Sequence, residues 1–221
     1  MALVRSEVDI TATIVGSDPY TYTLTPAGGA PTAGNLIVVG FAHEVRQVSS
    51  VAGTNMSFTI NGAQQSAQGG WMSQWKCIVG ASPGTTITLT MSGSSGVDGY
   101  FFFMEFDNAN ADQSASTANG STNAATTTHN SGSVTPPTAN NMIVAQSYRG
   151  NRTWTEDGAF TQLTTGTNFY GVCYLIQTAA TAQNNETTSD TNGDSGMTIG
   201  AFAGVSAGQH DPFTKILFKV A

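Results

Sequence analysis

The stretch Tyr100-Phe101-Phe102-Phe103-Met104-Glu105-Phe106 decides the fold, because it is the most apolar segment of the chain. Side chains of a strand alternate between the two faces of a sheet, so an apolar run of this kind fills both faces. The stretch Leu36-Ile37-Val38-Val39 has the same character. Both stretches therefore predict central strands of a sheet that is covered on each side.

Outside these two stretches, alternation of apolar and polar residues is the recurring pattern. No long segment has the 3.6-residue period of an amphipathic helix, and Gly, Pro and Asn separate the alternating runs. Further strands are predicted at residues 8–14, 20–24, 75–79, 85–90 and 214–220. The pattern predicts an all-β fold with antiparallel strands.

An internal repeat divides the chain into similar halves, at about residues 8–113 and 125–220. Pro-Thr-Ala-Gly-Asn-Leu-Ile-Val-Val at residues 31–39 returns as Pro-Thr-Ala-Asn-Asn-Met-Ile-Val-Ala at residues 137–145. A strand centred on a cysteine follows each copy, and an apolar strand closes each half. The same strands thus occur in the same order in both halves.

The segment that joins the halves is rich in Ser, Thr and Asn, and it is predicted to be a surface loop at about residues 114–124, followed by an edge strand that ends at Pro136. Two tandem domains would each hold only four or five strands, a thin core. We therefore expect one domain over residues 1–221, a single antiparallel jelly-roll-like β-sandwich of about eight to ten strands with internally similar halves.

Composition and charge exclude several classes of function. Only 10% of the residues are charged, against about 25% in an average soluble domain. The 14 acidic and 7 basic residues give a net charge of −7, and no basic cluster exists that could neutralise phosphates or anionic lipids. No apolar run approaches the roughly 20 residues that span a bilayer, and the apolar stretch before Arg5 is too short for a signal peptide. We expect no nucleic-acid partner, no membrane contact and synthesis in the cytoplasm.

Two sequence patterns suggest chemistry at residues 190–196. Gly193-Asp194-Ser195-Gly196 matches the core of a trypsin-like nucleophile motif, but that chemistry needs a His base and a buried Asp beside the serine. Asp190-Thr191-Asn192-Gly193-Asp194 places oxygen ligands at alternating positions, as a calcium loop does, yet residue 201 is Ala where an EF-hand requires Glu. We interpret the first as a polar turn and the second as a solvated acidic loop.

Other polar residues suit structural roles. His43, His129 and His210 are isolated, whereas zinc needs three or four converging ligands. Glu105 lies in an apolar strand and must find a donor, for which Arg46 or Arg149 is expected. We predict no catalytic residue, no metal site and no cofactor.

Cys77 and Cys173 are too few for a disulfide framework. They are expected to be buried thiols at matching positions of neighbouring strands. Whether they pair depends on a distance between their Cα atoms that the sequence does not give.

Three aromatic residues are candidates for glycan binding, because aromatic faces stack on sugar rings. Trp71 and Trp154 lie near polar turns, and Tyr148 accompanies them. Such residues also close the ends of sandwiches, and Trp75, inside an apolar strand, is expected in the core.

The order of these elements resembles a known class of proteins. A Gly-Asn-Leu-Ile-Val-Val strand at residues 34–39 is followed by a Trp-Lys-Cys strand, by Thr-Ile-Thr-Leu-Thr and by Phe-Met-Glu-Phe at residues 103–106. Over residues 30–205 the chain resembles the jelly-roll sandwich domains of structural proteins in tailed bacteriophage particles, in capsid decoration, head-fibre and tail-associated components. This resemblance implies a non-enzymatic virion protein that is made in the host cytoplasm and acts by protein–protein binding.

A protein of this kind binds other virion proteins and copies of itself, and terminal strands commonly pair with a neighbour's exposed edge. Leu3, Val4, Lys215 and Lys219 are the candidate assembly contacts. Related sandwiches also occur in carbohydrate-binding modules, so a glycan-binding module or phage adhesin that uses surface aromatics is the alternative.

Overall fold

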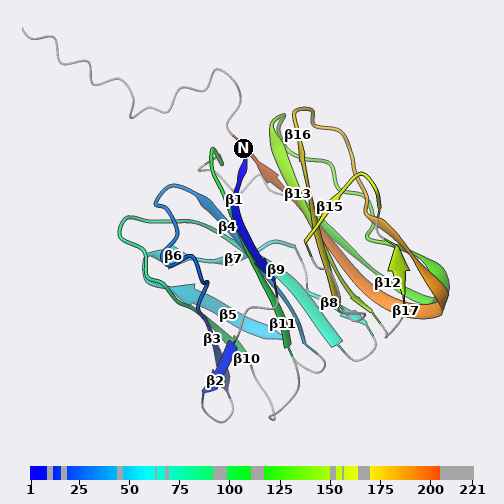
Figure 1. Ribbon diagram of the computed structural model, residues 1–221, viewed down its shortest axis with the longest axis horizontal. Coiled ribbons are helices and arrows are strands. Elements are labelled where there is room, and N and C mark those ends of the chain that lie inside the picture. Colours follow the sequence, from blue (N-terminus) through cyan, green and yellow to red (C-terminus); the bar gives the residue numbers. More distant parts are fainter. Residues whose placement is uncertain are drawn as a thin grey trace, which may run out of the picture.

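The computed structural model is all-β, as the sequence predicts. It describes residues 1–8, 12–15, 19–43, 47–62, 64–67, 70–91, 99–110, 117–149, 153–155, 157–163 and 170–204. Within these ranges the strands form three antiparallel sheets, and there is no helix (Figure 1). The described residues therefore contain no helix that is long and apolar enough to cross a membrane.

The central sheet contains the two apolar stretches that decide the fold. Its strands, in spatial order, are β1 (Leu3–Val8), β11 (Gly99–Phe106), β4 (Leu36–His43), β9 (Gly70–Ile78) and β7 (Thr59–Ile60), with β8 (Gln65–Ala67) also paired to β9. Strand β4 is hydrogen-bonded between β11 and β9, in an unbroken register from Leu36 to His43 on both sides.

The other two sheets cover the two faces of the central sheet (Figure 1). The second sheet has the order β2 (Ala12–Val15), β3 (Tyr20–Leu24), β10 (Ile87–Met91), β5 (Val48–Gly53) and β6 (Met56–Ser57). The third has the order β12 (Thr117–Asn130), β17 (Glu186–Ala203), β13 (Asn141–Arg149), β16 (Tyr170–Gln177) and β15 (Thr161–Gln162), with β14 (Trp154–Thr155) paired to β17.

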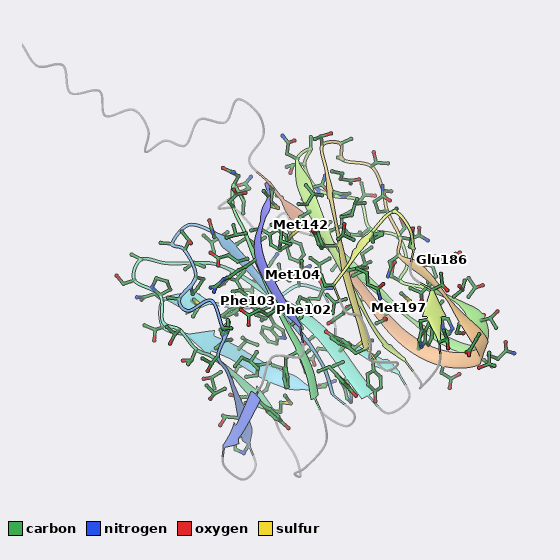
Figure 2. The ribbon with its side chains drawn as sticks, in the orientation of Figure 1. Phe102, Phe103, Met104, Met142, Glu186 and Met197 are labelled. Carbon is green, nitrogen blue, oxygen red and sulfur yellow. The ribbon has the colours of Figure 1, made fainter. Side chains whose placement is uncertain are left out.

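The strand β11 supplies both cores, because its side chains alternate between them. Phe101 and Phe103 pack in the cluster between the central and second sheets. Phe102 and Met104 pack in the cluster between the central and third sheets, where they meet Met142 of β13 (Figure 2). The prediction of a central sheet covered on each side is confirmed.

The junction between the central and third sheets contains two buried glutamines with reciprocal bonds. The Nε2 of Gln74 donates to the carbonyl oxygen of Val144 at 3.0 Å, and the Nε2 of Gln146 donates to the carbonyl oxygen of Ser73 at 2.9 Å. The hydroxyl of Tyr170 donates to the Oε1 of Gln146 at 2.9 Å. Each glutamine therefore attaches a strand of one sheet to the backbone of the other.

Several sequence predictions differ from the described structure. The loop predicted at residues 114–124 is strand from Thr117 onward, because the Thr, Ser and Asn residues pair with β17. The strand predicted at residues 8–14 is divided, since residue 8 ends β1 in the central sheet and residues 12–14 belong to β2 in the second. The strand predicted at residues 214–220 lies outside the described residues.

The two cysteines are buried and form no disulfide, but they do not occupy matching positions. Cys77 lies opposite Ile37 and Cys173 lies opposite Ala145. Ile37 corresponds to Ile143 in the repeat, so the two cysteines differ by two positions in register. Cys77 packs in the cluster between the central and second sheets, and Cys173 packs on the outer face of the third sheet. Burial raises the pKa of the Cys77 thiol to about 12, which keeps it protonated and unreactive.

The close approach of the central and third sheets requires a residue without a side chain at position 40. A Cβ on Gly40 would clash with the ring of Phe102 and would lie 2.7 Å from the Oε1 of Gln146. We expect Gly40→Ala to lower the free energy of unfolding by roughly 1–3 kcal/mol, as overpacking of a core does. Urea denaturation measures this loss. Gly158→Ala is the control, because a Cβ there has no neighbour within 4 Å, and an equal loss in both variants would contradict the close approach.

Candidate assembly interface

The strand β1 is an edge strand of the central sheet among the described residues. It carries the most exposed large apolar side chain of these residues. It pairs with β11 along one side, Leu3 opposite Phe106 and Arg5 opposite Glu105. The register shift between these pairs leaves Val4 as the extra residue of a β-bulge, and Val4 is 51% exposed. Bulges are common on edge strands, where they re-aim a side chain.

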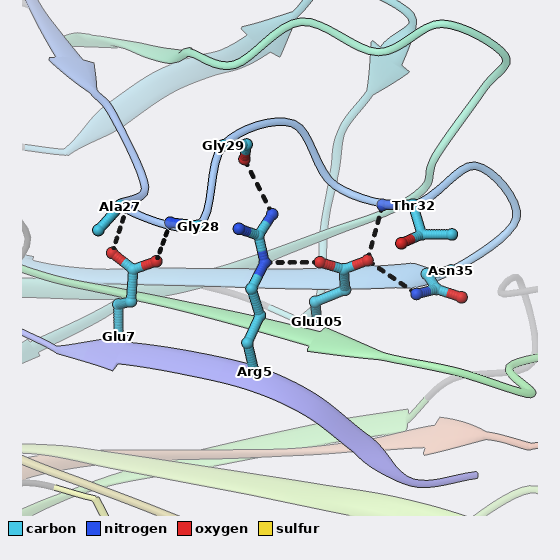
Figure 3. A network of polar contacts seen from close by, with 8 residues as sticks. All are labelled: Arg5, Glu7, Ala27, Gly28, Gly29, Thr32, Asn35 and Glu105. Atoms are coloured by element: carbon cyan, nitrogen blue, oxygen red, sulfur yellow. Dashed lines mark hydrogen bonds and ion pairs between the residues drawn. The ribbon is translucent and has the colours of Figure 1, made fainter.

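An ion pair fastens β1 to its neighbour. The Nε of Arg5 donates to the Oε2 of Glu105 at 2.7 Å, and the Nη2 of Arg5 donates to the carbonyl oxygen of Gly29 at 3.0 Å (Figure 3). The guanidinium also lies 4.9 Å from the centre of the Phe103 ring. Arg5 thus joins the edge strand, the adjacent strand and a turn of the connection to β4.

The carboxylate of Glu105 is buried and satisfied by further donors. Its Oε1 accepts from the backbone amide of Thr32 and from the Nδ2 of Asn35, both at 2.7 Å (Figure 3). The prediction that Arg46 or Arg149 would be its partner is wrong. Arg5 takes that place because the antiparallel register sets it opposite Glu105, although 100 residues separate them in sequence.

These contacts set the acidity of Glu105. Burial acts to raise the pKa of its carboxyl, but the hydrogen bonds from Thr32 and Asn35, together with the bond and charge of Arg5, outweigh burial. The pKa is therefore lower than its ordinary value. The ionised form is the one that the fold stabilises.

A second carboxylate, that of Glu7 on β1, binds the turn that Arg5 also contacts. The carboxylate of Glu7 accepts from the backbone amides of Ala27 at 2.8 Å and Gly28 at 3.4 Å (Figure 3). The amide of Ala2 donates to Asp107, whose own amide donates back to the carbonyl oxygen of Ala2. The start of the chain is therefore fastened to Asp107, and β1 is fastened to the turn at residues 27–28.

The four predicted assembly residues are placed only in part. Leu3 packs against the cluster between the central and third sheets, and Val4 is exposed at the bulge. Lys215 and Lys219 lie outside the described residues.

The candidate glycan-binding aromatics come from two sheets. Trp71, in β9 of the central sheet, is half-buried. Trp154, in β14 of the third sheet, is also half-buried, and its ring lies 4.4 Å from that of His129. Tyr148 is 6% exposed and belongs to the cluster between the central and third sheets. Trp75 lies in the core, as predicted.

A serine–histidine contact that the sequence does not predict lies inside the third sheet. The Nδ1 of His129 is 2.8 Å from the Oγ of Ser195, and its Nε2 is 3.1 Å from the Oγ of Ser189. The Ser189 hydroxyl donates to the carbonyl oxygen of Thr191, so in the tautomer that satisfies both contacts Nε2 donates to Ser189 and Nδ1 accepts from Ser195. His129 and Ser195 are fully buried, and the second ring nitrogen faces a hydroxyl, not the carboxylate of a catalytic triad.

The interpretation of residues 190–196 as a turn and a loop is wrong, because they belong to β17. Ser195 lies opposite Asn123 on one side and Arg149 on the other. Asp194 accepts from the amide of Ala125 at 2.7 Å. Among the described residues there is no group of three His, Cys, Asp or Glu side chains that could hold a metal ion. His210 and the side chain of His43 lie outside the described part of the chain.

Comparison with known protein families, with curated proteins and with solved structures finds no match to this chain.

Removing the cation beside Glu105 should destabilise the protein strongly. Arg5→Met leaves a buried carboxylate without its ion-pair partner, so we expect a loss of roughly 3 kcal/mol in the free energy of unfolding. Glu7→Gln on the same strand is the control, with an expected loss of about 1 kcal/mol or less, because its bonds to backbone amides are exposed. Urea denaturation at neutral pH compares the two. Equal losses would exclude a special role of the Arg5–Glu105 pair.

The same carboxylate predicts how stability depends on pH. The pKa of Glu105 is lower in the folded protein than its ordinary value of 4.5, so the folded state favours the ionised form. The ionised Glu105 carboxylate contributes fully to the free energy of unfolding above its pKa in the unfolded chain. This contribution disappears as the pH falls through its pKa in the folded protein. The stability difference between the native protein and Glu105→Gln should therefore be largest at neutral pH and should shrink below pH 4.5. Urea denaturation at a series of pH values measures it, and a constant difference down to pH 2 would contradict it.

Proposed function

We propose that the chain is a non-enzymatic structural protein of a tailed-phage particle, made in the host cytoplasm, which binds on the capsid exterior to other virion proteins and to copies of itself. The observation that carries this proposal is the β1 edge of the central sheet, with Val4 exposed at its bulge. An open sheet edge with an apolar residue is a template for pairing with another chain.

We propose that residues 1–110 fold as a jelly roll. Eight of the strands there pair as a long hairpin that is rolled over on itself: the first with the eighth, the second with the seventh, the third with the sixth and the fourth with the fifth. These pairs are β1 with β11, β3 with β10, β4 with β9, and β5 with β6. The contacts β11–β4 and β10–β5 complete the two sheets.

We further propose that the two halves derive from one unit. The third sheet has the order β12-β17-β13-β16, and the central sheet has the order β1-β11-β4-β9. The repeat places β13 in correspondence with β4, and each lies between two antiparallel partners. In this proposal the second half keeps one sheet of the unit and packs it on the equivalent sheet of the first.

The chemistry of the described residues favours binding over catalysis. Ser195, in the motif that resembles a nucleophile site, is fully buried with its histidine partner. Glu105 is engaged by three donors in a structural ion pair. Glycan binding is the alternative, and it would depend on Trp71 and Trp154, which are half-buried and lie on different sheets.

Size-exclusion chromatography with light scattering tests the assembly. We expect a mass above the 22.9 kDa of one chain, unchanged by EDTA. Val4→Asp should weaken self-association by roughly tenfold, since it sets a charge on the edge of an acidic protein. Ile176→Asp, at another exposed apolar residue in the third sheet, is the control and should leave the mass unchanged. A single-chain mass at all concentrations would refute self-assembly.

A further inference from the structure

We propose that residues 214–220 of one copy pair as an additional antiparallel strand with the open edge of β1 in a neighbouring copy. This inference deepens the assembly role proposed above and rests on it. It identifies the partner of the β1 edge as a segment of the same protein, Thr-Lys-Ile-Leu-Phe-Lys-Val, whose residues follow the described part of the chain.

The receiving edge belongs to the central sheet, which packs against the other two sheets. Within the described residues β1 ends the central sheet, with β11 paired to one side of it. Arg5 and Glu7 fasten the strand to the turn at residues 27–29, on the side of the second sheet. These contacts use side chains and hold the strand extended, while no strand among the described residues pairs with the backbone groups of its other side.

The donor segment has the pattern of a strand that covers one apolar face. Ile216, Phe218 and Val220 alternate with Lys215 and Lys219. An added strand gains affinity from main-chain hydrogen bonds and specificity from alternate side chains. Its apolar residues would continue one face of the central sheet, beside the exposed Val4.

The connection that leads to this segment is as long as the one that leads from the central sheet to the third sheet. After β11 ends at Phe106, ten residues lead to β12, which forms the edge of the adjacent sheet. After β17 ends at Ala203, ten residues lead to residue 214. Residues 214–220 therefore follow β17 at the same chain distance at which β12 follows β11.

The position of Gly204 favours a neighbouring copy over the chain's own edge. A Cβ on Gly204 would lie 3.3 Å from the Cβ of Met1, so the described chain ends beside the start of β1. To pair antiparallel with its own β1, the segment would have to begin at the Val8 end. The connection would first run along the strand for about 20 Å, most of its roughly 33 Å reach. The edge of another copy imposes no such detour.

Charge also selects this segment as the one that contacts another copy. Residues 1–204 contain 13 of the 14 acidic residues but only 5 of the 7 basic residues, so the bodies of two copies repel one another. Lys215 and Lys219 are the other two bases. The donor segment therefore brings positive charge to an acidic partner.

The first experiment removes the strand without touching the described sheets. Leu217→Pro deletes a backbone donor and disfavours pairing, whereas Leu217→Ala keeps the backbone intact. By light scattering we expect Leu217→Pro to fall to the single-chain mass of 22.9 kDa and Leu217→Ala to remain assembled. If both remain assembled, copies associate through another surface, so this inference fails while the proposed function stands. If the native protein is a single chain, the self-assembly itself fails.

The second experiment identifies the partner by disulfide cross-linking. Chains with Ser6→Cys on β1 are mixed with isotope-labelled chains that carry Ile216→Cys, Leu217→Cys or Phe218→Cys, and the mixture is oxidised. Cys77 and Cys173 are buried and do not compete. Mass spectrometry should find mixed dimers for at least one position and none with Ala182→Cys, an exposed control in the connection between β16 and β17. A cross-link that forms only within one doubly substituted chain would show pairing with its own sheet and overturn the proposal.

Discussion

The fold depends on one constraint, the burial of both faces of the central sheet. A strand such as β11, with Phe101 and Phe103 on one face and Phe102 and Met104 on the other, cannot leave either face in water. The second sheet covers one face and the third sheet covers the other. Because the edge of this sheet cannot be covered in the same way, β1 is fastened by the side chains of Arg5 and Glu7. Among the described residues β1 is the last strand on that side of the central sheet, and side-chain contacts hold it in place.

Local patterns in the sequence predict most of this architecture. Alternation identifies the strands, and the double-sided apolar runs at Leu36–Val39 and Tyr100–Phe106 identify the central sheet, because these signals depend only on neighbouring residues. The prediction fails where strand chemistry is weak. The Thr, Ser and Asn residues of β12 resemble a loop in isolation, and pairing with β17 makes them a strand. The described strands form three sheets, whereas the predicted single sandwich would have two.

The polar contacts could not be derived, because they join residues far apart in sequence. Arg5 meets Glu105 across 100 residues, and His129 meets Ser195 across 66. The partner of a buried polar group depends on register, and a shift of one residue exchanges the faces of a strand. The sequence indicates that Glu105 needs a donor, since an unpaired buried charge is too unfavourable. Which arginine supplies it follows only from the pairing of β1 with β11.

The two reciprocal glutamines have a mechanical consequence. Apolar contact between sheets has no direction, so two apolar faces alone can slide past each other with little change in buried area. Gln74 and Gln146 each bond to a backbone atom of the opposite sheet, and a slide in either direction would break both bonds at once. Their amide nitrogens would then be buried without these acceptors, which is strongly unfavourable. The central and third sheets therefore resist shear along their interface, and a pull on one half of the chain is transmitted to the other without slippage.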